Sequence, residues 1–182
     1  MHEQPRRLSD VKVFEVNPDF TVAAFASVLI VVWRTPPTVD AFRKLDSHTA
    51  QFTQERASSI AVLIVIERTS DKPPSQAARE ENVQLSMKYQ KLIAANATVL
   101  VGSGVKQSMA RFVISTIQLM SPSRIPHGTF ESVTAATVWI ANLLKGFSVN
   151  GLNAAVDAVR ALEPLDVPVD APRTAPSSLA SR

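Results

Sequence analysis

The segment that determines the fold class is Ile60-Ala61-Val62-Leu63-Ile64-Val65-Ile66, seven apolar residues without a charge. A second run of the same kind, Val28-Leu29-Ile30-Val31-Val32, lies upstream. Runs of β-branched residues without polar alternation are typical of strands covered on both faces, because a half-exposed strand would alternate. The two runs therefore predict buried strands in a sheet that other elements cover on both sides.

Segments with helical periodicity follow these strands. After Pro36-Pro37, Thr38 is expected to cap a helix whose apolar residues recur at spacings of three and four. Ser75 is expected to cap a second helix, and Asn96 to end it. A third buried strand is then expected over residues 98–101, followed by a helical stripe from Met109 to Met120.

The two ends of this pattern predict further strands and helices. Residues 11–16 read as a strand, and the turn at residues 17–19 joins it to the run 20–33, which predicts an antiparallel hairpin. Residues 124–130 are expected to form a fourth parallel strand at the sheet edge, because Pro126 has no N–H for a central ladder. Two final helices are expected, with these apolar faces: Val133, Ala136, Ile140 and Leu143, then Leu152, Val156, Val159 and Leu162.

The elements in order give β-β-α-β-α-β-α-β-α with one added helix. Repeated βα units predict an α/β fold whose mixed, mainly parallel sheet has right-handed crossovers and helices packed on it. Residues 1–10 are expected to be a flexible start and 11–145 the α/β domain. Residues 146–162 are expected to form the additional helix, and 163–182 a disordered tail rich in Pro and Ser.

Composition excludes several classes of function. The chain carries 19 Lys and Arg against 16 Asp and Glu, and these basic residues are scattered, so no nucleic-acid partner is expected. It has no Cys, which excludes disulfides and cysteine catalysis, fits a cytoplasmic location and makes a metal site unexpected. No cofactor is expected. The longest apolar stretch, residues 22–33, is shorter than the ~20 residues of a membrane-spanning helix, so no span is expected.

The turn Gly102-Ser103-Gly104 follows a buried strand and precedes a helix, where exposed backbone N–H groups can bind an anion. Lys106 lies close by. The turn lacks the third glycine of a dinucleotide fingerprint and the Gly-Lys-Ser/Thr of a phosphate loop. The favoured interpretation is a tight turn that needs a positive φ, with a small-molecule or anion site as the alternative.

Histidine-based catalysis has little material here, since the only histidines are His2, His48 and His127. His127 lies in a Pro-His-Gly turn that is expected at the end of the fourth strand, the edge where open α/β sheets bind ligands. It is the one candidate for a hydrolase. No Ser-His-Asp constellation is recognisable, so the chain is not expected to be an enzyme. Glu67 is interpreted as part of a solvated loop.

The stretch from Phe130 to Ile140 reads as a strand ending in an aromatic residue, a polar helix start, then an Ala and an apolar pair. Together with Val28–Trp33, Ile60–Ile66 and Thr98–Gly102, it gives residues 11–145 a layout that resembles STAS-like domains. This is the family of anti-sigma-factor antagonists and transporter tails. The resemblance implies a non-enzymatic bacterial regulatory module that binds a protein partner, with a homodimer as an open alternative.

In signalling members of that family, a phosphorylatable Ser follows the strand that corresponds to residues 60–66, within an Asp-Ser-Ser-Gly-like stretch. Here that place reads Glu67-Arg68-Thr69-Ser70-Asp71-Lys72-Pro73-Pro74-Ser75, without the Gly. Ser70 and Ser75 are the candidate phosphorylation sites, although a plain N-cap is the favoured interpretation of Ser75. This loop and the neighbouring helix are expected to face the protein partner.

Overall fold

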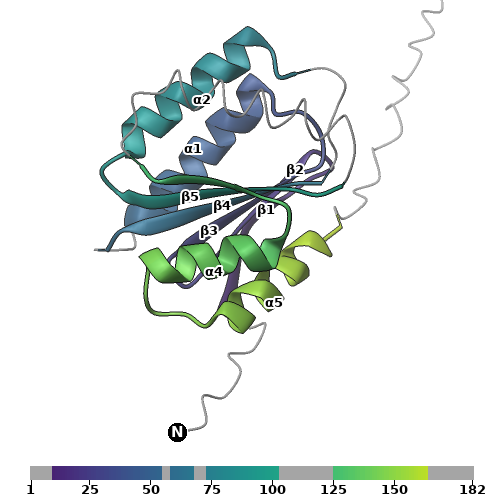
Figure 1. Ribbon diagram of the computed structural model, residues 1–182. Coiled ribbons are helices and arrows are strands. Elements are labelled where there is room, and N and C mark those ends of the chain that lie inside the picture. The colour runs from purple at the N-terminus through teal and green to yellow at the C-terminus, as the bar shows by residue number, and fades with distance from the viewer. Residues whose placement is uncertain (1–9, 55–57, 68–72, 103–124, 164–182) are drawn as a thin grey trace, which may run out of the picture.

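The computed structural model describes residues 10–54, 58–67, 73–102 and 125–163 of the chain (Figure 1). Its described strands form one six-stranded sheet in sequential order. The strands are β1 (Val11–Val16), β2 (Phe20–Phe25), β3 (Val28–Trp33), β4 (Ile60–Ile66), β5 (Ile93–Leu100) and β6 (His127–Phe130). The helices are α1 (Val39–Gln54), α2 (Gln76–Tyr89), α4 (Val133–Leu143) and α5 (Val149–Arg160).

The molecule has three layers. Helices α1 and α2 cover one face of the sheet, and α4 and α5 cover the other (Figure 1). β2 pairs antiparallel with both β1 and β3, whereas β3, β4, β5 and β6 pair in parallel. β2 is therefore the one strand of the six that runs against the others. This arrangement confirms the predicted α/β fold with a mixed, mainly parallel sheet.

The strands predicted from apolar runs are found at β3 and β4. Every residue of β3 is buried, and β3 lies between β2 and β4, so neither edge of it meets solvent. The two faces of β3 feed two separate cores: Ile30 and Val32 pack toward α4 and α5, and Leu29 and Val31 pack toward α1. A run of β-branched residues suits this environment, because both pleat faces are dry.

The run 20–33 differs from its prediction, because it forms two strands and the chain opens with three. A two-residue turn, Ala26-Ser27, separates β2 from β3, and Phe25 pairs with Val28 across it. Ala26 has a φ of +48°, a left-handed conformation that hairpin turns usually give to Gly or Asn. Ala does not favour this turn and Ser favours turns only weakly, so the sequence did not indicate a break between the two strands.

The boundary between α2 and β5 was also predicted wrongly. α2 ends at Tyr89, and Gln90 is its C-cap. Asn96 lies inside β5, paired with Val62 of β4, and is not a helix cap. Leu92 follows the helix and is 44% exposed. Small residues make this possible: Ala95 and Ala97 are fully buried in the core that α4 also enters.

The predicted helix starts are found in the structure. Oγ1 of Thr38 accepts a hydrogen bond from the Ala41 amide, and Oγ of Ser75 accepts one from the Ala78 amide, each at 3.2 Å. In α1 the residues at the predicted spacings of three and four are buried: Phe42, Leu45, Thr49 and Phe52. In α4, Leu143 is 45% exposed, and Leu144 beyond the helix is the buried residue. The stripe predicted from Met109 to Met120 lies outside the described residues.

Helix α5 belongs to the same core as α4 and the sheet. Leu152, Val156 and Val159 are fully buried beside residues of β3, β4 and β5. Ser148 caps the helix by accepting a hydrogen bond from the Gly151 amide at 3.0 Å. Among the described helices, none has both the length and the apolar character needed to cross a membrane.

Candidate interaction site at the carboxyl edge of the sheet

The parallel strands β3, β4 and β5 all end at one edge of the sheet, called the carboxyl edge below. Arg34, Glu67 and Val101 directly follow the three strands. Their backbone N–H groups continue the ladder, since Glu67 N donates to Trp33 O and Val101 N to Ile66 O, each at 3.0 Å. The starts of α1 and α2 therefore lie at this same edge.

Two short segments of the same composition lead into these helices. Pro36-Pro37-Thr38 precedes α1, and Pro73-Pro74-Ser75 precedes α2. In each, two prolines stop regular backbone pairing and the following hydroxyl residue caps the helix. Because β3 and β4 are parallel neighbours and both helices cover one face, the fold brings the two segments together.

The two segments line an open hollow of about 510 Å³. We call it the proline groove; its lining residues are Pro36, Pro37, Thr38, Val39, Asp40, Pro73, Pro74 and Ser75. The lining is mostly apolar, and the hydroxyls of Thr38 and Ser75 are used as helix caps. The side chain of Asp40 is 87% exposed, with Arg43 at 3.7 Å. The groove thus offers proline rings and one accessible carboxylate.

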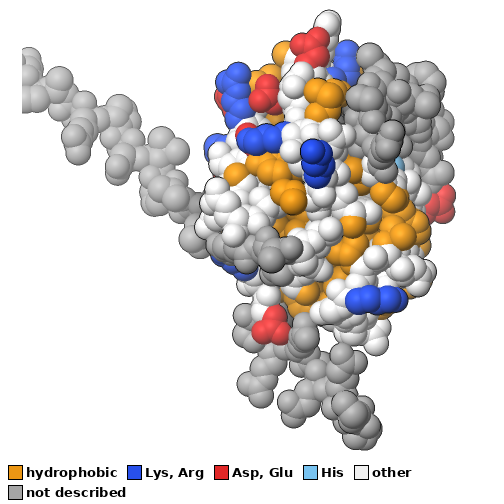
Figure 2. All heavy atoms as spheres, turned by 90° about the vertical axis from the view of Figure 1, so that its left-hand side faces the viewer, with side chains coloured by type: hydrophobic (Ala, Val, Ile, Leu, Met, Phe, Trp, Pro, Cys, Tyr) orange, Lys and Arg blue, Asp and Glu red, His pale blue; other side chains and the backbone are white. Residues whose placement is uncertain are grey.

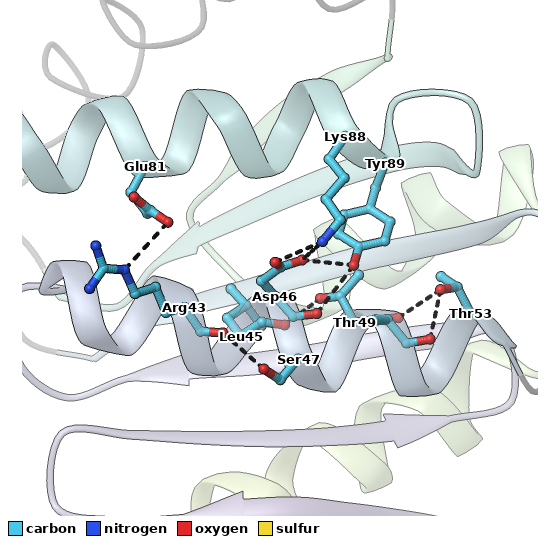
Figure 3. A network of polar contacts seen from close by, with 10 residues as sticks. Arg43, Leu45, Asp46, Ser47, Thr49, Thr53, Glu81, Lys88 and Tyr89 are labelled. Atoms are coloured by element: carbon cyan, nitrogen blue, oxygen red, sulfur yellow. Dashed lines mark hydrogen bonds and ion pairs between the residues drawn. The ribbon is translucent and has the colours of Figure 1, made fainter.

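Polar contacts join α1 to α2, the two helices that begin at the groove (Figure 3). Asp46 of α1 accepts hydrogen bonds from Lys88 Nζ and from the Tyr89 hydroxyl, each at 2.7 Å. Nearer the groove, Arg43 Nε lies 3.9 Å from a carboxylate oxygen of Glu81. Burial would raise the pKa of Asp46, but the bonds from Lys88 and Tyr89 outweigh it and lower that pKa. Burial, followed by the bond to Asp46, raises the pKa of Tyr89.

An ion-pair triad lies at the carboxyl edge as well. Arg160 Nε, at the end of α5, donates to Glu67 Oε1 at 2.9 Å, and Arg34 Nε lies 3.8 Å from Glu67 Oε2. The Glu67 side chain is only 23% exposed. The prediction that Glu67 belongs to a solvated loop was therefore wrong: it joins the ends of β3, β4 and α5.

The candidate anion site is only partly described. Gly102 is exposed at the carboxyl edge with a φ of +125°, as the tight-turn interpretation expects. Ser103, Gly104 and Lys106 lie outside the described residues. The described strands follow one another in sequential order, so the sheet has no reversal of strand order, the feature that opens a ligand crevice in α/β sheets.

The phosphorylation candidates divide in the same way. Ser75 is exposed, lines the proline groove and caps α2. Ser70 lies outside the described residues. The structure thus places one of the two candidates in the groove.

His127 is not where the sequence predicted it. It is the first residue of β6 and so lies at the opposite, amino edge of the sheet, away from the carboxyl ends of the strands. Its Cα pairs with that of Asn96 in β5. Nε2 of His127 and Oδ1 of Asn96 are buried without a hydrogen-bond partner within the described part of the chain. Desolvation lowers the pKa of His127. Burial thus favours the neutral imidazole, and no carboxylate or hydroxyl among the described residues is hydrogen-bonded to its Nε2.

The amino edge of the sheet carries exposed apolar side chains (Figure 2). Leu92, just before β5, is 44% exposed, and Leu143, at the end of α4, is 45% exposed.

No group of three or more metal-ligating side chains occurs among the residues that the structure describes.

Sequence reasoning missed a second polar cluster, on β1 and α1. Glu15 Oε2 lies 2.7 Å from Nε2 of His48, and its Oε1 accepts hydrogen bonds from Lys44 and Asn17, each at 2.8 Å. A bulge between Val13 and Glu15 interrupts the pairing with β2 at this position. Burial would raise the pKa of Glu15, but the bonds from Lys44, His48 and Asn17 together lower it. Lys44 and His48 lie 29 and 33 positions from Glu15 in the sequence, so no local pattern indicates that they meet it.

Comparison with known proteins gives a limited result. No family model matches the sequence, and no curated protein matches it. A solved structure that does match is an uncharacterised protein of the DUF3478 family with a SpoIIAA-like fold, from Shewanella loihica PV-4. The match covers 71% of this chain and 92% of that one, at 16% identity and a TM-score of 0.43. The fold class of the present chain rests on its own strand pairings.

Proposed function

We propose that this chain is a non-enzymatic protein-interaction module whose partner docks in the proline groove. The observation that supports the proposal is the convergence of two Pro-Pro segments, far apart in sequence, on one open apolar hollow. The two helices that begin at the groove are joined to each other, because Asp46 of α1 bonds to Lys88 and Tyr89 of α2. A preformed apolar surface binds without first having to be ordered, which favours recognition.

The lining defines the chemistry of the partner. Four proline rings and Val39 favour an extended segment with aliphatic or aromatic side chains. The exposed carboxylate of Asp40 favours a cationic group at one end of that segment. Such a contact is small, so its affinity would suit a reversible regulatory interaction.

Ser75 gives the proposal its regulatory part. A phosphate on Ser75 would lie in the groove and at the N-terminus of α2, where negative charge is favoured. It would also place negative charge near Asp40, and so change which segments the groove accepts. We propose Ser75 as the residue through which docking is controlled, and keep Ser70 as the second candidate.

The test is an affinity capture from the native host with matched charge variants. Pro36→Glu/Asp40→Lys alters the groove at two exposed residues, and Val138→Glu/Asp157→Lys introduces the same charges at exposed positions on α4 and α5. A partner captured by the wild type and the α4/α5 variant, but lost from the groove variant, is the expected result. A partner that the groove variant retains, or no partner for any of the three folded proteins, would overturn the proposal.

A further inference from the structure

The last described residues of the chain lie at the same carboxyl edge of the sheet as the proline groove, on the side that α4 and α5 cover. The carbonyl oxygen of Leu162 accepts a hydrogen bond from Arg34 Nη2 at 2.8 Å. Arg34 is itself fixed, since its Nη1 donates to Thr21 Oγ1 at 2.8 Å and its backbone N to Asp19 O at 2.8 Å. Pro36, the first residue of the groove, follows Arg34 by two positions. Glu163, the last described residue, therefore lies at the edge of the sheet that also holds the groove.

The sequence that follows Glu163 has a one-sided apolar pattern. It reads Leu165-Asp166-Val167-Pro168-Val169-Asp170, with Arg173 three residues further on. In an extended chain successive side chains point to opposite sides, so the three aliphatic residues would share one side and the two aspartates the other. This is the pattern that the lining of the groove favours: apolar side chains, then a cation.

We propose that residues 165–169 dock in the proline groove of their own chain, with Arg173 beside Asp40. The inference rests on the proposed function in that it takes the groove as a docking site for an extended apolar segment. The residues involved follow Leu162 by three to seven positions, which span about 10–25 Å when extended. Leu162 lies on the α5 side of the carboxyl edge and the groove on the α1 side, so the segment would pass over this edge, a path that such a length spans.

Docking within one chain makes the segment an autoinhibitor. A short tether gives its binding motif an effective concentration on the order of millimolar, so a partner has to displace it. The partner is then a protein that presents a similar segment, aliphatic side chains followed by a cation. Weakening residues 165–169 would strengthen partner binding and leave the groove intact.

The absence of Cys from the chain makes a distance measurement straightforward, because introduced cysteines are the only labelling sites. Nitroxide labels at Gln76→Cys, exposed at the start of α2, and at Ala171→Cys report on the groove and the segment in the full chain. Double electron–electron resonance is expected to give a narrow distance distribution for this pair. Adding Val167→Asp/Val169→Asp is expected to broaden it, whereas Ala175→Asp/Ala180→Asp, with the same added charge, should not.

Two results would overturn the inference. One is a distribution for the 76–171 pair that is already broad, and the other is a narrow one that Val167→Asp/Val169→Asp leaves unchanged. The measurement contains no partner, so its outcome is independent of the capture experiment. If the segment docks but no partner is captured, the proposed function fails alone; if a partner depends on the groove but the distribution is broad, this inference fails alone.

Discussion

Ala26 is a single residue whose backbone conformation conflicts with its side chain. Its φ of +48° lies in the left-handed region, within the turn that joins β2 to β3. A left-handed L-residue costs roughly 1–2 kcal/mol, and Gly avoids that cost. We expect Ala26→Gly to raise the free energy of unfolding by about 1 kcal/mol, because the greater freedom of Gly in the unfolded chain offsets part of the gain.

Urea unfolding followed by circular dichroism measures this change. Ala50→Gly, in the interior of α1, is the matched control and should lower stability by about 1 kcal/mol. A loss of stability in Ala26→Gly similar to that of the control would show that the turn does not favour Gly.

His127 makes stability depend on pH. Desolvation lowers the pKa of its imidazole in the folded chain below the ordinary value of 6.5. The unfolded chain therefore binds a proton first as the pH falls, and stability is lost below about pH 6.5 until the folded pKa is passed. The carboxylates Glu15 and Asp46, whose pKa values are lowered from 4.5 and 3.8, lose their contributions only at more acidic pH.

The free energy of unfolding of His127→Gln should depend less on pH between 8 and about 5 than that of the wild type. The glutamine side chain at this position binds no proton in this range. Unfolding free energies of both proteins across that range give the comparison. Two parallel curves would mean that His127 does not cause the loss.

At the scale of elements, α1 and α2 are coupled through the Tyr89 hydroxyl. This group is buried with its ring and donates to Asp46 at 2.7 Å. Tyr89→Phe keeps the ring and removes the bond, so we expect a loss of about 0.5–1.5 kcal/mol. Lys88→Met should cost less, because the Lys88 side chain is 54% exposed. Chemical unfolding ranks the two variants, and an unchanged Tyr89→Phe would contradict the role assigned to the bond.

Elements were predictable from sequence where local chemistry dictates them. Thr38 and Ser75 were recognised as caps because a capping hydroxyl acts within three residues of its own position. β3 and β4 were recognised because continuous β-branched sequence has few other uses. β5 was placed too late because Ala94 and Ala95 favour a helix locally and Asn96 is typical of a helix end. Their strand conformation depends on pairing with β4, which no window of sequence contains.

At the scale of the whole molecule, Glu67 connects three distant elements. It joins the end of β4 to Arg34 after β3 and to Arg160 in α5. Glu67→Gln should cost about 1–3 kcal/mol, because two partly buried guanidinium groups lose their anionic partner. Hydrogen exchange should also speed up at the amides of Ala161 and Leu162, which bond to carbonyls of α5.

The control for this prediction is Asp157→Asn, which also replaces a carboxylate by an amide, at an exposed position of α5. Exchange that speeds up equally in both variants would show that α5 is not held through Glu67. Exchange in α1 should be unaffected by either change.

The candidate site was harder to predict than the fold. The family resemblance indicated the loop that ends at Ser75, which forms one wall of the proline groove. The other wall, Pro36 to Asp40, was interpreted only as a helix start. The two walls meet because β3 and β4 are parallel neighbours, a tertiary fact. His127 was placed at the wrong edge of the sheet because a four-residue strand leaves its limits weakly specified in sequence; its parallel direction was predicted correctly.

The sequential order of the six strands has a consequence for synthesis. Each strand pairs with the one made just before it, from β1 through β6. As the chain leaves the ribosome, the sheet can grow by addition at a single moving edge, with the N-terminal strands paired before the last one is translated. No strand has to be inserted between two that have already paired, so an incomplete chain always presents the correct edge to the next strand.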